Sequence, residues 1–178
     1  MAYRLGDQTA KDAQRLTMNP IAHIDPIGTV LLPAFLMFSG MPVFGWAKPV
    51  PFNPAHFKDH RTGTMLVGAA GPGSNILIAV AAGILFRFFA TSLPLIFAEF
   101  LIFLCLINLI LAAFNLIPVP PLDGSRIAAW FMPNHMLRKY AKLERFGMLI
   151  VLILVMGPIR WLFPMIRSLA GFILGIRF

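Results

Sequence analysis

Apolar residues in this chain come in long uncharged runs separated by short polar and mostly basic segments. Two of the runs, residues 64–86 and 100–117, contain no charged side chain. At about 1.5 Å of rise per residue, each is long enough, or nearly so, to cross a hydrocarbon layer of roughly 30 Å. The pattern therefore predicts a membrane-spanning helix over each run. Small residues gather in the first half of 64–86, where they would allow a neighbouring helix to approach closely.

A third apolar run begins near Phe146, and we predict a spanning helix over residues 146–164. Prolines and arginines interrupt the chain beyond Gly157, so residues 160–178 form either the end of this span or a helix lying in the membrane interface. With the two clearer runs, this gives about three transmembrane helices.

Residues 26–47 are also uncharged, but Pro33, Gly40 and Pro42 interrupt them. Charge decides between a span and a loop. If this run crossed the membrane, the basic segments 47–63 and 123–145 would lie opposite the basic N-terminal region, against the positive-inside rule. We therefore favour a re-entrant loop, which leaves all basic segments on the cytoplasmic side. Residues 1–26 are polar and are predicted to form a surface loop.

Composition agrees with a membrane location. Hydrophobic residues make up 58% of the 178 residues and charged residues 12%, against the roughly 25% charged that is typical of soluble domains. The excess of 15 basic over 7 acidic residues could indicate nucleic acid, but with this hydropathy it marks cytoplasmic loops instead. We expect residues 1–178 to form one all-α, membrane-embedded domain with no nucleic-acid partner.

The last clear span ends in a proline-rich stretch that carries a carboxylate. Residues 115–124 read Asn-Leu-Ile-Pro-Val-Pro-Pro-Leu-Asp-Gly, with the acid at Asp123. The three prolines remove backbone donors and stop an ordinary helix, so the chain next to Asp123 is predicted to be irregular and shielded from lipid by protein. A carboxylate on irregular backbone at the membrane boundary more often belongs to a functional site than to a segment without a specific role.

This stretch resembles the aspartate motif of the site-two proteases, which are intramembrane zinc metalloproteases. The match covers Asn115, Pro118, Pro120, Leu122, Asp123 and Gly124. Further segments resemble the family in the same order along the chain, namely Tyr3–Asp7, Leu16–Pro20, His23–Pro26, Phe44–Pro51 and Ala70–Asn75.

One family motif is missing. The H-E-x-x-H segment, which gives the family two histidine zinc ligands and the general-base glutamate, occurs nowhere in the 178 residues. In the family it precedes the part that Tyr3–Asp7 resembles. We therefore expect this chain to represent the protease from just after that motif, with an incomplete zinc site, no catalytic glutamate and no activity alone.

The resemblance implies that Asp123 is the third zinc ligand. The alternative is that Asp123 only caps the segment that follows, because Asp before Gly-Ser is also turn chemistry. The resemblance also implies that Asn75 and Asn115 bind substrate, with Asn75 facing the cleft and holding the substrate backbone. The alternative for Asn75 is a hydrogen bond between helices.

Other polar residues favour ordinary roles. His56 and His60 have the spacing of a zinc-binding pair, and Asn53-Pro54 could start a helix that presents both rings. However, Phe57 stands where a catalytic glutamate would be, so two solvated loop histidines are favoured. His23 with Asp25 is expected to be a hydrogen-bonded or solvated pair. The segment Gly45–Pro51 would suit an edge strand beside an extended substrate.

Two functions remain open from the sequence. The first is a zinc endopeptidase of a prokaryotic cell membrane that cuts the transmembrane segment of a partner protein near the cytoplasmic face. The second is a non-catalytic scaffold or adaptor that keeps the fold. A channel or transporter is disfavoured, because no internal repeat is visible.

Overall fold

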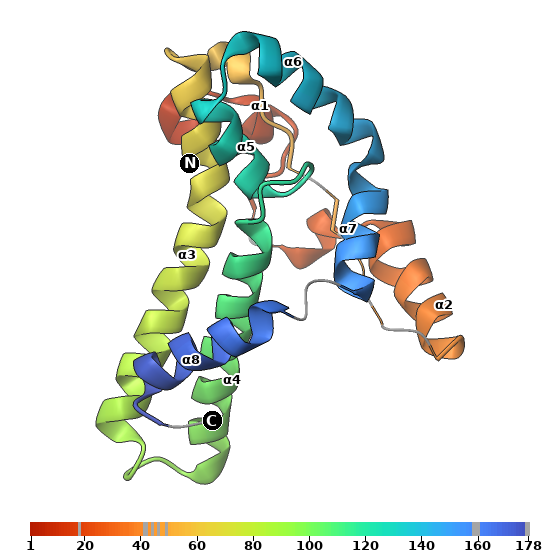
Figure 1. The fold of residues 1–178 in the computed structure, drawn as a ribbon. Helices are drawn as coiled ribbons and strands as arrows, with labels where there is room; N and C mark the ends of the chain where they lie inside the picture. Colours follow the sequence, from red (N-terminus) through yellow and green to blue (C-terminus); the bar gives the residue numbers. More distant parts are fainter. Residues whose placement is uncertain are drawn as a thin grey trace. The chain divides into compact units, whose positions relative to one another are not determined.

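The computed structural model (Figure 1) describes residues 1–17, 19–40, 43, 45, 47–48, 50–157 and 161–176. The chain forms two compact units, Met1–Gly63 and Thr64–Phe178. All regular elements among the described residues are helical, which confirms the predicted all-α class. The segment predicted as an edge strand, Gly45–Pro51, has no strand among its described residues, while Trp46 and Pro49 lie outside them.

The first unit consists of short helical elements, three of which begin at Asn-Pro or Asp-Pro pairs. The side chains of Asn19, Asp25 and Asn53 each accept a backbone N–H of the turn that follows, and proline fills the first helical position. The elements are η1 (Ala2–Leu5), α1 (Thr9–Asp12), η2 (Pro20–His23), the π-helical η3 (Pro26–Leu31), α2 (Leu32–Phe38) and η4 (Pro54–His56).

A buried carboxylate ties the two ends of this unit together. Asp7 is fully buried, and its oxygens accept hydrogen bonds from Thr9, from the backbone N–H of Asn53 at 2.9 Å and from Nδ1 of His56 at 2.8 Å. Burial alone would raise the pKa of Asp7, but these donors outweigh it and hold the pKa well below its usual range. The prediction of a simple surface loop over residues 1–26 is therefore wrong at Asp7.

The second unit contains the two helices that are long and apolar enough to cross a membrane. Helix α3 (His60–Phe89) has 30 residues and mean hydropathy 1.7, and α4 (Leu95–Asn115) has 21 residues and mean hydropathy 2.7. Both predicted spans, 64–86 and 100–117, fall on these helices. Each helix exposes large apolar side chains, such as Leu77 and Phe103. They are followed by α5 (Asp123–Phe131), α6 (Asn134–Ala141), η5 (Lys142–Phe146), α7 (Gly147–Met156) and α8 (Leu162–Leu174).

The core of this unit lies where α3, α4 and α8 meet (Figure 1). Helix α3 contributes Ala79 and Ala82, α4 contributes Cys105 and Leu109, and α8 contributes Leu162, Ile166, Ala170 and Leu174. Helix α3 also carries Gly83 at this contact. A Cβ on Gly83 would overlap Cγ2 of Ile173, so α3 and α8 approach each other over a position with no side chain.

The remaining membrane predictions have less support. Residues 146–164 are not one helix, because α7 ends at Met156 and α8 begins at Leu162. At about 1.5 Å per residue, each is shorter than the roughly 30 Å of a hydrocarbon layer. The same holds for the apolar helix Pro26–Phe38 in the predicted re-entrant segment 26–47. The third span, the re-entrant loop and the single-domain organisation all stay predictions.

The Gly83 contact predicts a stability difference between two glycines of α3. We expect Gly83→Ala to lower the free energy of unfolding by about 1–2 kcal/mol, because the added methyl group overpacks against Ile173. Gly73→Ala is the matched control, because a Cβ there meets nothing within 4 Å and alanine favours a helix over glycine by up to about 1 kcal/mol. Thermal unfolding in detergent micelles measures both, and equal effects of the two changes would contradict the packing described.

Asp7 predicts a dependence of stability on pH in the first unit. Because its pKa is lowered in the folded state, its stabilisation is present above the pKa of an unfolded aspartate, about 3.9, and is lost as the pH falls further. We expect the unit to open as the pH falls below about 4, as measured by amide exchange of residues 1–63. Asp7→Asn should remove this dependence and open the unit already at neutral pH, whereas the exposed Asp12→Asn should not.

Candidate functional site

The candidate site begins where α4 ends and the proline-rich loop 116–122 starts. Its four non-proline residues each donate their backbone N–H to a carbonyl. The bonds are Leu116 to Ala112 at 3.0 Å, Ile117 to Phe114 at 3.1 Å, Val119 to Ile117 at 2.8 Å and Leu122 to Val119 at 2.9 Å. The other three positions are prolines and have no N–H. The loop is irregular, as predicted, yet it holds no unpaired backbone donor, which is the condition for irregular chain at membrane depth.

Helix α5 starts at Asp123, folded tightly against the loop. A Cβ on Gly124 would overlap the carbonyl oxygen of Leu116 and would lie 2.6 Å from that of Ile117, so only glycine allows this return of the chain. The N-cap residue of α5 is Leu122, and its side chain makes no capping hydrogen bond. Asp123 therefore stands in the first turn rather than at the cap, where a carboxylate is favoured by the helix dipole.

Glycines of α3 receive the first turn of α5. A Cβ on Gly68 would lie 2.9 Å from the carbonyl oxygen of Asp123, and a Cβ on Gly71 would lie 2.8 Å from its Oδ2. The predicted close approach to the small residues of this segment is confirmed at these two positions. The neighbour is the short helix α5, and the atoms that come closest to α3 include those of the candidate ligand itself.

The Asp123 carboxylate is half buried and paired within its own helix. Nη1 of Arg126 donates to Oδ1 of Asp123 at 3.3 Å, and 28% of the Asp123 side chain is exposed. Burial raises the pKa of Asp123, and the positive charge of Arg126 opposes this in part. The result is a partly desolvated carboxylate with an open side, the kind of perturbed acid that is frequent in functional sites.

Two later helices hold the loop from its other side. The hydroxyl of Tyr140 in α6 donates to the carbonyl of Pro118 at 2.7 Å. At the start of α7, a Cβ on Gly147 would lie 2.7 Å from Cδ of Pro121. Sequence reasoning missed both residues, because their partners lie 22 or more positions earlier in the chain and no local pattern links them.

The structure places Asn75 on the face of α3 that meets α5. It lies four residues beyond Gly71 and seven beyond Gly68, spacings that bring side chains to one face of a helix. At about 1.5 Å per residue it is roughly 6 Å further along α3 than Gly71. The buried Ala79 follows one turn later. Asn75 is half-buried, between the contact with α5 and the core around α8.

Asn115 lies at the end of α4, just before the loop. Its Nδ2 donates to the carbonyl of Leu111 one turn earlier, at 2.9 Å. The structure thus shows a local hydrogen bond for this amide. Asn108, two turns earlier in α4, is buried and makes the same kind of bond, from Nδ2 to the carbonyl of Leu104 at 2.8 Å. Its polarity within an apolar run was the available signal, and sequence reasoning missed it.

His56 and His60, which have the spacing of a zinc-binding pair, do not share one helix. Asn53 caps a helical turn, as predicted, but this turn ends at His56 because Phe57 is extended. Nδ1 of His56 bonds Asp7, and Nδ1 of His60 donates to the carbonyl of Pro54 at 2.6 Å. The two rings therefore do not share a helix face, and the disfavoured zinc-binding pair has no support. His23 and Asp25 bond the backbone rather than each other, through Nε2 of His23 to Thr17 and Oδ1 of Asp25 to the N–H of Ile27.

A hydrolytic zinc site takes three protein ligands and leaves a fourth position for water. Among the described residues, no three His, Cys, Asp or Glu side chains come together. Asp123 offers one oxygen donor of the right kind, partly open and fixed by its neighbours. The residues of this chain that the structure describes therefore fit one ligand position and do not by themselves make a zinc site.

Comparison with known proteins relates the chain to metalloproteases. The model of peptidase family M50 matches residues 90–158, which include Asn115 and Asp123. A protein of Bacillus subtilis named "Putative zinc metalloprotease YwhC" is 37% identical over 177 residues, covering 94% of this chain and 78% of the relative. No solved structure matches.

Two further relatives carry the same kind of name. "Putative zinc metalloprotease Rip2" of Mycolicibacterium smegmatis is 28% identical over 167 residues, covering 93% of this chain and 63% of the relative. "Putative zinc metalloprotease MJ0611" of Methanocaldococcus jannaschii is 34% identical over 90 residues, covering 49% of this chain and 46% of the relative. With more than a third of its residues identical to YwhC over nearly its whole length, the chain belongs to peptidase family M50, the family of the site-two proteases.

Proposed function

We propose that this chain is the part of a membrane-embedded zinc metalloprotease that supplies the aspartate ligand and the substrate-facing helices. Its substrate is the transmembrane segment of another protein, cut near the cytoplasmic face of a prokaryotic cell membrane. The single observation that carries the proposal is the Asp123 carboxylate, held at the start of α5 against Gly71 of the segment 70–75. Two segments that resemble the family's motifs thus meet at one carboxylate.

Each residue has a distinct role in this proposal. Asp123 is the metal ligand, and Arg126 and Gly71 position its carboxylate. Together with further ligands, Asp123 would hold the zinc ion, which would supply a water of lowered pKa as the nucleophile. Asn75, on the same face of α3 as Gly71, donates a hydrogen bond to a substrate carbonyl. Asn115 contributes to substrate binding at the end of α4, with less support, because its amide nitrogen bonds its own helix.

The membrane location rests on α3 and α4. Both are long and apolar enough to cross, and both expose large apolar side chains that suit lipid. The positive-inside rule favours placing the basic segment 123–145, and with it Asp123, on the cytoplasmic side. The alternative, a scaffold without catalysis, has no support in the names of the relatives, which all denote metalloproteases.

The ligand role of Asp123 is tested in the protein expressed from its full coding region. We expect Asp123→Asn to abolish cleavage of a single-span reporter, because a ligand is lost while the apolar helices that drive insertion are unchanged. Asn75→Ala should lower the rate about a hundred- to a thousandfold, as loss of one oxyanion donor does. Gly71→Ala should cost on the order of a hundredfold by displacing the carboxylate.

Controls separate these effects from poor folding. Gly73→Ala, two residues from Gly71, meets no neighbour and should leave cleavage unchanged at equal expression. Glu99→Gln removes an exposed acid far from the site in sequence and should also be neutral. Full activity of Asp123→Asn would sink the assignment of the metal ligand.

The topology predicts which positions share a side of the membrane. Single cysteines introduced near Lys58 and Lys139 should react with an impermeant reagent from the cytoplasmic side, and one near Thr91 from the other side. The native Cys105 is buried and gives little background. Labelling of Lys58 and Lys139 positions from opposite sides would rule out the re-entrant model and this orientation.

A further inference from the structure

A pocket lies beside the candidate site, and Arg126 belongs to both. Its volume is ≈ 200 Å³. Its walls come from α3, the proline-rich loop, α5, α6 and η5, and include Thr64, Pro120, Pro121, Arg126, Tyr140 and Glu144. Because Arg126 both lines the pocket and bonds Asp123 at 3.3 Å, the pocket is one side chain away from the proposed metal ligand.

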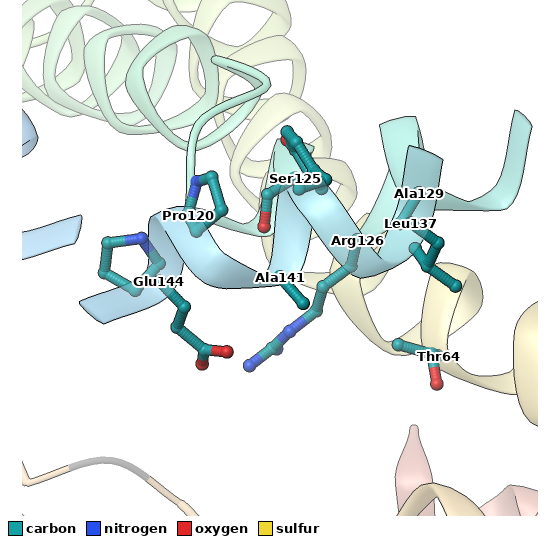
Figure 2. A pocket seen from close by; sticks show the side chains of 10 residues that line it. Thr64, Pro120, Ser125, Arg126, Ala129, Leu137, Ala141 and Glu144 are labelled. Atoms are coloured by element: carbon teal, nitrogen blue, oxygen red, sulfur yellow. The ribbon is translucent and has the colours of Figure 1, made fainter. Parts of the chain in front are cut away.

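Glu144 supplies the only carboxylate among the described residues that line this pocket. Figure 2 shows its carboxylate extending to the side of the pocket that the Arg126 guanidinium also reaches. No ion pair within 4.0 Å joins Glu144 to another of the described residues, and Arg126 is paired with Asp123 instead. The adjacent Arg145 is directed to the ring of Phe146, 4.6 Å from its centroid.

The Glu144 carboxylate lies in a strongly basic part of the chain. Residues 123–145 carry five basic side chains, and Glu144 is their only acid besides Asp123. None of the five forms an ion pair with Glu144, and Arg126, which lines the same pocket, is paired with Asp123, so the Glu144 carboxylate can accept a further cation. The rest of the lining is mostly apolar, with Ala129, Leu137 and Ala141 beside the prolines. Apolar walls with one carboxylate match a lysine or arginine side chain, whose stem packs on apolar surface while its charged head finds the acid.

The proposed substrates carry such side chains in the right place. Membrane-spanning segments have an excess of lysine and arginine at their cytoplasmic ends, and cleavage is proposed near that face. We propose that this pocket binds a basic residue from the cytoplasmic flank of the substrate, with Glu144 as the specificity-determining residue. The inference rests on the proposed function and adds a sequence preference to it.

The test compares single-span peptides that differ only in one flanking residue, lysine, glutamine or glutamate. Glu144→Gln in the full-length protein should raise KM for the lysine peptide about three- to tenfold, the range of a partly exposed ion pair. It should leave kcat unchanged and have no effect on the glutamine peptide. Added salt should shrink the preference for lysine in the unchanged protein, because exposed charges are screened.

Two further variants test the role of charge: one reverses the charge of Glu144, and the other neutralises an acid outside the pocket. Glu144→Lys should reverse the order of preference, so that the glutamate peptide binds better than the lysine peptide. Glu99→Gln, a change of equal chemistry at an exposed site outside the pocket, should alter neither. An equal effect of Glu144→Gln on the lysine and glutamine peptides, or no effect on either, overturns the inference.

Binding without cleavage separates this inference from the proposed function. Competition binding with protein depleted of metal by a chelator should keep the lysine preference while cleavage of all peptides is lost. If Asp123→Asn still cleaves, the proposed ligand role fails, and the lysine preference and its dependence on Glu144 are still measured. If cleavage is lost and no preference is found, the pocket proposal alone fails.

Discussion

The contact between the first turn of α5 and two glycines of α3 determines where the carboxylate of Asp123 lies. Gly68 admits the backbone carbonyl of Asp123, and Gly71 admits its side chain. A methyl group at either position would occupy space that α5 already fills. The hydrogen bonds of the proline-rich loop and its contacts with α6 and α7 hold Asp123 in this position against α3.

Helix α3 uses small residues twice, for two different partners. Its first half receives α5 at Gly68 and Gly71, and its second half receives α8 at Ala82 and Gly83. In lipid, helices gain little from hiding apolar surface from each other, so close backbone contact over small residues is a main source of affinity. Asn75 lies between the two contacts, where the helix keeps a polar group rather than a methyl.

Sequence patterns predicted the helices of this structure better than they predicted which segments contact one another. The two apolar runs became α3 and α4, but α3 starts earlier than charge suggested, because Asp59 accepts the N–H groups of Arg61 and Thr62 and so begins the helix in polar sequence. The burial of Asp7 could not be predicted, since its donors Asn53 and His56 lie more than 40 residues away.

In the candidate site, too, some features could be predicted from the sequence and others could not. The proline motif predicted both an irregular loop and the importance of its acid, because these follow from residue chemistry at consecutive positions. The half-buried state of Asp123, its approach to α3 and the pocket around Glu144 depend on segments that meet only in three dimensions. A local pattern contains no information about such meetings.

The prolines of the loop have a consequence for its tolerance of mutation. Every backbone N–H of the loop already donates a hydrogen bond to a carbonyl. Pro118, Pro120 and Pro121 have no N–H, so no further acceptor is needed. Alanine at the buried Pro120 would remove a ring and add an N–H group to a loop whose donors are already paired. The new donor would then destabilise the loop in addition to the missing ring. Substitutions in this loop should be limited more by the backbone N–H groups that they add than by the change in side-chain volume.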